Sequence, residues 1–220
     1  MRRLLRDALL DAAALVLPVA CAGCDAPDRA LCDGCRAALA PGPVRAERPG
    51  LSAWAAIEYA GTAARVIRSF KDEGRTDAAR PLGAALRAAL AAGCAGLDGG
   101  RREIAVVPST GAARRRRGYD PVRMLVRSAG FSPARVLAAL PREDQAALGR
   151  HARRVNSAGS FVARRPLDGR RFVLVDDVLT TGATLADAAR AIVAAGGIVD
   201  AVSVLAETRL RIDRANPDAW

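Results

Sequence analysis

Apolar residues recur along this chain at two spacings, one typical of helices and one typical of buried strands. Helical spacing occurs in GTAARVIRSFKDEG from residue 61 and in AARPLGAALRAALAAG from residue 78. Short apolar runs occur in SAWAAIEYA from residue 52 and in IAVVP from residue 104. Gly and Pro residues separate these segments, as expected where helices and strands end. The pattern predicts alternating helices and strands beyond residue 50.

The clearest alternation lies in the C-terminal third of the chain. FVLVDD at 172–177 predicts a buried strand, LADAARAIVAAGG from residue 185 predicts a helix, and VDAVSVLAE at 199–207 predicts a further strand. Strand, helix and strand in this order form a βαβ unit, which requires a parallel sheet. We therefore expect an α/β fold in which helices flank a parallel sheet. Ligands bind such sheets at the carboxyl ends of the strands.

The first 49 residues follow a different pattern. Apolar residues at helical spacing precede Pro18, and Asp7 and Asp11 interrupt them, which favours an amphipathic helix over an export signal. The Pro- and Gly-rich stretch APGPVRAERPG at 40–50 predicts a linker. We expect a small N-terminal part over 1–49 and the main domain over 50–220. Because no uncharged apolar run reaches membrane-spanning length, we expect a cytoplasmic protein without a membrane span.

Four of the five cysteines lie close together, in two pairs of identical spacing. Cys21-x2-Cys24 is followed by Cys32-x2-Cys35. In a reducing compartment this arrangement is typical of a tetrahedral zinc site with four cysteine ligands. Two disulfides or four free thiols are the alternatives. A shell of four thiolates leaves no open coordination position, so the predicted zinc is structural.

The charge of the chain favours anionic partners without identifying one. The 34 Lys and Arg residues against 23 Asp and Glu residues give a net charge of +11. Such a charge attracts nucleic acid or a diphosphate substrate. Aromatic residues make up 4% of the chain, which argues against an extensive base-stacking surface. All but one of the cationic residues are arginines, a bias that a GC-rich genome also produces.

Several cationic residues are candidates for contact with phosphate. Lys71 is the one lysine of the chain, and Arg114 to Arg117 form a run that we expect in a loop after a strand. We predict substrate contacts for Lys71, for the pair Arg117 and Gly118, and for Arg153 in a later loop. The alternative for the arginine run is a solvated loop.

The segment FVLVDDVLTTGATL at 172–185 carries the most specific chemistry. We expect Asp176 and Asp177 to emerge where the strand ends. Two adjacent acids repel each other unless a cation or hydroxyl groups satisfy them, so they suit a ribose diol and Mg²⁺. The following turn offers hydroxyl and backbone N–H groups at a helix N-terminus, a ready anion site. Its residues are Thr180, Thr181, Gly182, Ala183 and Thr184. An ordinary capped turn would explain the threonines but not the paired acids.

This segment resembles the signature of type I phosphoribosyltransferases. The resemblance covers VLVDDVLTTGATL and implies that Asp176 and Asp177 contact the ribose hydroxyls of phosphoribosyl pyrophosphate in the catalytic site. It also implies that residues 180–184 wrap the 5′-phosphate. A Mg²⁺ ion would be held largely by substrate oxygens, in keeping with its preference for phosphates and water.

Further motifs narrow the resemblance to the ComF/GntX proteins. A four-cysteine N-terminus, SFKDEG, VVPSTGAARRRRGYD, a Gln before an Arg-rich loop and RRVNSAGSF occur in the order seen in that family. The resemblance implies a type I phosphoribosyltransferase-like sheet with a small N-terminal zinc appendage. It also implies an association with uptake of transforming DNA in competent bacteria, with single-stranded DNA and other DNA-uptake proteins as partners.

Two motifs depart from that family. Where the family has a proline-rich and histidine-bearing run after the strand, this chain has VPSTGAA at 107–113. The family usually continues the Arg-Gly pair as Phe-Asn-Gln, whereas Tyr119, Asp120 and Pro121 follow Gly118 here. A carboxylate at Asp120 would repel a nearby pyrophosphate unless it contacts a metal or an arginine.

Three functions remain open from the sequence. The first is a phosphoribosyltransferase in which Mg²⁺ and basic loops offset the charge of departing pyrophosphate, with positioning and electrostatics supplying most of the catalysis. The second is a non-catalytic module that binds single-stranded DNA during uptake. The third is nucleobase salvage, which the cysteine pairs and the N-terminal extension disfavour.

Overall fold

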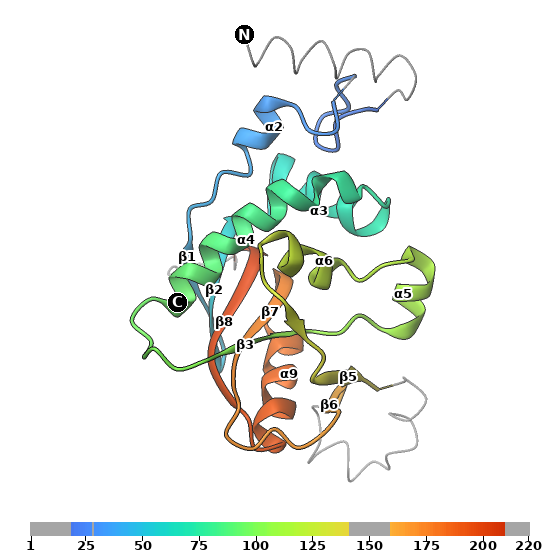
Figure 1. Cartoon of the computed structure of the whole chain (residues 1–220). Coiled ribbons are helices and arrows are strands. Elements are labelled where there is room, and N and C mark those ends of the chain that lie inside the picture. Colours follow the sequence, from blue (N-terminus) through green and yellow to red (C-terminus); the bar gives the residue numbers. More distant parts are fainter. Residues whose placement is uncertain (1–18, 28, 141–158, 210–220) are drawn as a thin grey trace, which may run out of the picture.

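The computed structural model describes residues 19–27, 29–140 and 159–209, which form an α/β structure with helices around a six-stranded sheet (Figure 1). The strand order is β1-β2-β8-β7-β3-β4. The β1–β2 pair is antiparallel and the other four pairs are parallel. The predicted mostly parallel sheet is therefore confirmed. The strands are β1 Val44–Arg48, β2 Leu51–Glu58, β3 Glu103–Val106, β4 Pro133–Ala134, β7 Arg171–Leu179 and β8 Ile198–Glu207.

Helices connect most of these strands. They are α2 Asp33–Ala37 before the sheet, α3 Gly61–Asp72, η1 Thr76–Ala78 and α4 Ala79–Cys94 between β2 and β3, α5 Gly111–Arg117 and α6 Pro121–Ser128 between β3 and β4, and α9 Ala183–Ala194 between β7 and β8. A separate antiparallel pair is formed by β5 Leu137–Ala139 and β6 Phe161–Ala163. Within the described residues, no helix has the length and apolarity needed to cross a membrane.

The two faces of β7 belong to two hydrophobic cores. Val173 and Val175 pack with residues of α3, α4 and α6, whereas Phe172 and Leu174 pack with residues of α9. Successive side chains of a strand point to opposite faces, so a strand covered on both faces has a continuous apolar sequence. Each of these four side chains is at most 1% exposed. The run FVLV is apolar throughout because both faces of β7 are covered.

The connections from β3 and β7 leave the sheet in opposite directions. β3 continues through α5 and α6 to its neighbour β4, and β7 continues through α9 to its neighbour β8 on the other side. A topological switch point therefore lies between the carboxyl ends of β3 and β7, the place where open α/β sheets bind ligands. The last β3–β7 pair is Val106 with Val175, and β7 continues to Leu179. The final residues of β7 thus border the switch point without a β3 partner.

Two expectations about the ends of elements were wrong. Asp176 and Asp177 were expected at the end of the strand but lie inside β7, because pairing with β8 continues to Leu179 opposite Glu207. The arginine run does not form a loop but the helix α5. The hydroxyl of Thr110 accepts a hydrogen bond from the Ala113 N–H at 3.2 Å and so caps that helix. The segments predicted at 52–60, 61–74, 78–93, 104–108, 185–197 and 199–207 agree to within a few residues with β2, α3, α4, β3, α9 and β8.

The expected linker at 40–50 contains a strand. In β1 the side chains of Ala46 and Arg48 are buried, while Val44, Arg45 and Glu47 are exposed. This alternation is typical of a strand with one covered face. The Pro and Gly residues that predicted a linker lie at the ends of β1, outside its paired residues. The helix expected before Pro18 lies outside the described residues.

Candidate functional site

A pocket of about 1050 Å³ opens at the switch point between β3 and β7. Its walls come from the ends of β2, β3 and β7, the first turns of α9 and the start of β6. Seven residues predicted from the sequence line it: Lys71, Arg117, Asp176, Asp177, Thr180, Ala183 and Thr184. Thr181 and Gly182 complete the turn beside it, and Gly118 lines a different hollow. Arg153 lies outside the described residues.

The paired acids are held by contacts from two directions. The Nζ atom of Lys71, on α3, lies 2.7 Å from Oδ2 of Asp177, a side chain that is about 8% exposed. The backbone N–H of Asp177 donates to Oδ1 of Asp176, and the N–H of Val178 donates to Oδ1 of Asp177, both at 2.8 Å. Both carboxylates thus accept hydrogen bonds from backbone N–H groups of their own strand, which helps to fix their orientation.

The environment of Asp176 opposes its ionisation. Loss of water around the carboxyl, followed by the negative charge of Asp177, raises the pKa of Asp176 to about 8. For Lys71, partial burial lowers the pKa, but the charge of Asp177 outweighs it and the net shift is upward. The environment of the pair therefore favours the protonated form of Asp176, and a cation bound there would favour the ionised form instead.

The turn after β7 leaves room for a ligand at the N-terminus of α9. Gly182 has φ of 84°, a left-handed conformation that glycine adopts without strain. A Cβ atom at Gly182 would lie 3.2 Å from side-chain atoms of Arg48 and Leu51, so a larger residue would also require these side chains to shift. The hydroxyl of Thr181 accepts from the Ala183 N–H at 3.4 Å. The helix behind this turn presents N–H groups that favour an anion.

The opposite wall depends on an acid that the sequence motifs did not reveal. Asp187 of α9 is 8% exposed, and its Oδ2 accepts from the Ser160 N–H at 2.8 Å. Arg190 donates to Oδ1 of Asp187 at 2.7 and 2.9 Å and to the Phe161 carbonyl at 3.2 Å. The two side chains thus attach the start of β6 to α9. Their i, i+3 spacing on a predicted helix was the available signal.

Arg48 was also missed, because it lies in the stretch expected as a linker. Its side chain is buried, and its Nε donates to the Thr180 carbonyl at 2.6 Å. An arginine in a stretch rich in proline and glycine gives no sequence signal for a contact with a turn more than a hundred residues away.

The three residues that depart from the family motif have structural roles. Oδ1 of Asp120 accepts from the Arg123 N–H at 3.1 Å and caps α6, whose first residue is Pro121. The Tyr119 hydroxyl donates to the Phe70 carbonyl, and the two rings lie 5.9 Å apart. Asp120 lines hollows that contain arginines rather than the switch-point pocket.

The arginine run divides between two surfaces. Arg117 lines the switch-point pocket and pairs with Asp72 at 2.8 Å. Its Nε is buried without a hydrogen-bond partner among the described residues. Arg114 instead lines two adjoining hollows of about 460 and 680 Å³.

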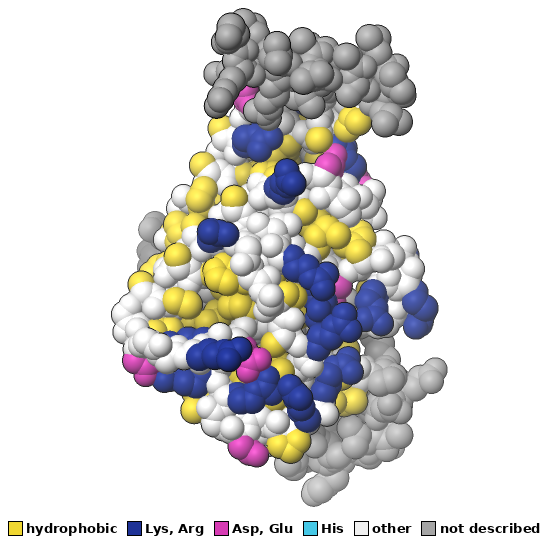
Figure 2. Space-filling view, viewed as in Figure 1, with side chains coloured by type: hydrophobic (Ala, Val, Ile, Leu, Met, Phe, Trp, Pro, Cys, Tyr) yellow, Lys and Arg dark blue, Asp and Glu magenta, His cyan; other side chains and the backbone are white. Residues whose placement is uncertain are grey.

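These two hollows form what we call the arginine surface. Its members are Arg80, Arg114, Arg123, Arg127, Arg135 and Arg164. Arginine side chains gather over α5 and α6 (Figure 2). Burial, followed by the charge of Arg135, lowers the pKa of Arg123. Within the described part of the chain, none of the six forms an ion pair, whereas Arg48, Arg171 and Arg190 do. Unpaired like charges on a concave surface favour an anionic ligand.

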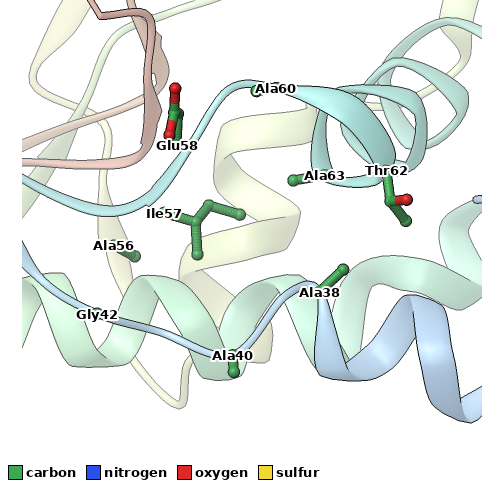
Figure 3. Close-up of a pocket in the computed structure, with 9 residues that line it drawn as sticks. All are labelled: Ala38, Ala40, Gly42, Ala56, Ile57, Glu58, Ala60, Thr62 and Ala63. Atoms are coloured by element: carbon green, nitrogen blue, oxygen red, sulfur yellow. The ribbon is translucent and has the colours of Figure 1, made fainter.

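A smaller hollow, of about 320 Å³, lies between the segment after α2, the end of β2 and the start of α3 (Figure 3). Glu58 and Thr62 are the only polar side chains among the residues that line it. Glu58 also pairs with Arg209 at 3.0 Å. This hollow therefore has no cluster of acids and bases like that of the switch-point pocket.

The four paired cysteines come together as a candidate metal site. The Sγ atoms of Cys21, Cys24, Cys32 and Cys35 all lie within 4.8 Å of one another. A Cβ atom on Gly23 would lie 2.6 Å from Sγ of Cys35, so glycine is needed for the backbone to pass. The described residues contain no disulfide among them. Four thiols at these distances fit a tetrahedral metal ion such as Zn²⁺.

The electrostatics of these thiols also suit a cation. Burial raises the pKa of Cys21, but N–H donors from Cys32 and Gly23 at 3.3 and 3.4 Å outweigh it and lower this pKa to about 6. Burial and the other thiols raise the pKa of Cys35. The four thiols therefore do not ionise together without a positive charge between them.

No protein-family model matches the chain, and no curated protein is significantly similar to it. Function is therefore inferred from the residues of the site.

The cysteine cluster predicts the metal content of the protein. We expect about one zinc per chain, because four thiolates complete its tetrahedral shell. Cys32→Ser should remove the zinc and unfold the segment around α2 while the sheet persists, and Cys94→Ser should change neither. Metal analysis with thiol titration checks this, and metal-free protein with four reduced thiols and a folded segment would contradict it.

The raised pKa of Asp176 predicts a pH-dependent stability. Protonated Asp176 contributes to stability, and this contribution is fully present below the pKa of an unfolded Asp, about 3.9. It is lost as pH rises towards the folded pKa of about 8. Asp176→Asn should therefore raise the unfolding temperature at pH 8 by at least about 3 °C, roughly 1 kcal/mol for this size, and by less at pH 5. Thermal unfolding at both pH values measures this. Asp168→Asn, at an exposed position, is the control, and a difference independent of pH would refute the expectation.

Proposed function

We propose that this chain is a phosphoribosyltransferase-type protein whose switch-point pocket binds phosphoribosyl pyrophosphate with Mg²⁺. One observation carries the proposal. Asp176 and Asp177 lie at the switch point, and the turn 180–184 follows them at the N-terminus of α9. A single segment thus offers acids for a ribose diol and N–H groups for a 5′-phosphate.

The residues of the pocket suit the charges of this ligand. Asp176 and Asp177 would accept hydrogen bonds from the ribose hydroxyls. Mg²⁺ prefers carboxylate, phosphate and water oxygens, and the raised pKa of Asp176 indicates a carboxyl group that a cation would stabilise as an anion. When bound, Mg²⁺ would offset negative charge on the pyrophosphate. Lys71 and Arg117 line the same pocket and would add positive charge there.

The reaction supported by this arrangement is transfer of the phosphoribosyl group. The bond between C1 of the ribose and pyrophosphate breaks, and a nucleophile of the acceptor forms the new bond at C1. The chain's own residues would hold both ends of the substrate while positive charge grows on the ribose and negative charge on the pyrophosphate. Positioning and electrostatic stabilisation account for such catalysis without a protein nucleophile.

The proposal also covers the family of the protein and the cellular process in which it acts. The order of motifs supports a type I phosphoribosyltransferase fold of the ComF/GntX kind, with structural zinc at the four cysteines. That family's association with natural competence would place the protein in DNA uptake. A nucleobase salvage enzyme is the less favoured form of the same transferase.

A second candidate function is binding of single-stranded DNA. The arginine surface favours it, because six arginines without ion pairs in the described structure line two adjoining hollows. A phosphate backbone supplies negative charge at regular intervals and is bound largely through such contacts. The exposed ring of Phe131 lies 5.8 Å from the guanidinium of Arg87 and lines neither hollow, so phosphate contacts rather than base stacking would supply the affinity.

The pocket predicts a specific binding pattern. Calorimetry should show Mg²⁺-dependent binding of phosphoribosyl pyrophosphate. Asp176→Asn with Asp177→Asn should weaken it at least about 100-fold by removing the diol contacts and the site for the cation. Thr184→Val should weaken ribose 5-phosphate about tenfold, since a hydrogen bond to a charged group contributes roughly 1.5–3 kcal/mol.

The two variants test different halves of one ligand. Thr184→Val should leave Mg²⁺-pyrophosphate affinity unchanged, because Thr184 belongs to the turn proposed for the 5′-phosphate. Unaltered binding of phosphoribosyl pyrophosphate in the double asparagine variant would exclude the assignment of the acids.

The arginine surface predicts a change in salt dependence. Arg123→Ala with Arg135→Ala should weaken single-stranded DNA binding and lower the slope of log affinity against log salt by about 0.7 for each phosphate that is no longer bound. Arg65→Ala with Arg68→Ala removes the same charge from exposed positions on α3 and serves as the control. Fluorescence anisotropy measures these slopes. Equal slopes for the two double variants would show that DNA affinity depends on net charge and not on the arginine surface.

A further inference from the structure

Arg48 is a buried cation behind the turn proposed to bind phosphate. Its side chain is 3% exposed, although it comes from β1, which pairs with β2 alone in the sheet. Burying a charge is costly unless every donor is satisfied and an opposite charge lies nearby. An apolar side chain of similar length would fill the same space without that cost. Side-chain volume is therefore not a sufficient reason for an arginine here.

The guanidinium group of Arg48 joins three separate segments. Its Nε donates to the Thr180 carbonyl at 2.6 Å, and one terminal nitrogen donates to the Thr208 carbonyl at 2.6 Å. The same nitrogen lies 3.1 Å from Oε2 of Glu207. The other terminal nitrogen donates to the Glu47 carbonyl at 2.9 Å. One side chain thus connects β1, the end of β8 and the turn after β7.

Backbone hydrogen bonds also hold the turn 180–184 on both of its sides. The Thr208 N–H donates to the Leu179 carbonyl at 2.9 Å, one residue before Thr180. On the other side of the turn, the Ala186 N–H donates to the Gly182 carbonyl at 2.9 Å and begins α9. A Cβ atom on Gly182 would lie 3.2 Å from the Cβ atom of Arg48, so the two residues are closely packed. Arg48 therefore constrains both the carbonyl of Thr180 and the path of the chain at Gly182.

We propose that Arg48 is a positioning residue for the turn 180–184. It holds the turn so that the hydroxyl and N–H groups proposed to bind the 5′-phosphate converge before the ligand arrives. The identity of the ligand in this inference rests on the proposed function. The effect of Arg48 on the structure of the turn does not. Because anion sites built from N–H groups depend on their mutual geometry, removing the Arg48 hydrogen bonds affects phosphate affinity more than affinity at the acids.

The first experiment compares Arg48→Met with Arg45→Met. Arg45 is the matched control, because it lies on the same strand with an exposed side chain paired to Glu47. Calorimetry uses ribose 5-phosphate and Mg²⁺-pyrophosphate as separate probes. Arg48→Met should weaken ribose 5-phosphate about tenfold or more, in line with hydrogen bonds that involve a charged group, and leave Mg²⁺-pyrophosphate unchanged. Arg45→Met should change neither affinity.

A merely structural role for Arg48 gives a different result. General destabilisation would weaken both probes by the same factor, and that outcome would overturn the proposal. Equal effects of the Arg48 and Arg45 variants would also overturn it. Arg48→Lys keeps the charge but loses the planar fork, so it should restore part of the ribose 5-phosphate affinity. If Arg48→Met does not fold, Arg48→Lys still tests the proposal, because it should weaken ribose 5-phosphate binding more than Mg²⁺-pyrophosphate binding.

Amide hydrogen exchange provides a readout that needs no ligand. The N–H groups of Thr208 and Ala186 flank the turn and should exchange about tenfold faster in Arg48→Met than in Arg45→Met, because local opening of this region becomes easier. Amides in the centre of β7 should keep their rates. If wild type binds neither probe, the proposed function fails, and the exchange rates alone decide the role of Arg48. Unchanged rates at Thr208 and Ala186 would refute that role.

Discussion

The pair of carboxylates at the open end of β7 is the constraint on which the site depends. Adjacent acids are tolerated there because Lys71 balances Asp177 and because a proton remains on Asp176 near neutral pH. The early end of β3 leaves the last residues of β7 facing the pocket. Under the proposed function, a ligand with hydroxyl donors and a divalent cation would replace the proton, so the same local repulsion would favour its binding.

The helix that carries Lys71 connects this site to the cysteine cluster. Cys21, Leu31 and Cys35 share a hydrophobic core with four residues of α3, which are Ala63, Val66, Ile67 and Phe70. A Cβ atom at Gly23 would also lie 3.0 Å from Val66. The cluster is therefore packed on the helix whose last turn pairs with Asp177. A structural metal at these thiols would support the position of Lys71 without taking part in chemistry.

Two further contacts complete the frame around the pocket. Asp187 and Arg190 hold β6 against α9 on one side, and Arg48 holds the turn after β7 on the other. Both use a charged side chain to satisfy backbone groups between elements that are far apart in the sequence. Such contacts order a binding site because each buried carbonyl or N–H group must find a partner.

The sequence by itself determined the elements whose signals are local. The run FVLV predicted a strand buried on both faces, the spacing of the cysteines predicted their cluster, and the order of strand, turn and helix placed the paired acids beside the turn that begins a helix. Lys71, Asp177 and Thr184 were accordingly expected at the pocket they line. These predictions depend on period, spacing and residue type within short segments.

The tertiary structure alone decided what depends on a distant partner. VRAER became β1 because β2 lies beside it, and the acids fell inside β7 because β8 extends the pairing past them. The arginine run divided because α5 lies between two concave surfaces, so that Arg117 met Asp72 and Arg114 met other arginines. Arg48 became part of the site because its partners come from residues 180 and 208. Chain neighbours carry no information about such partners, which only folding brings within hydrogen-bonding distance.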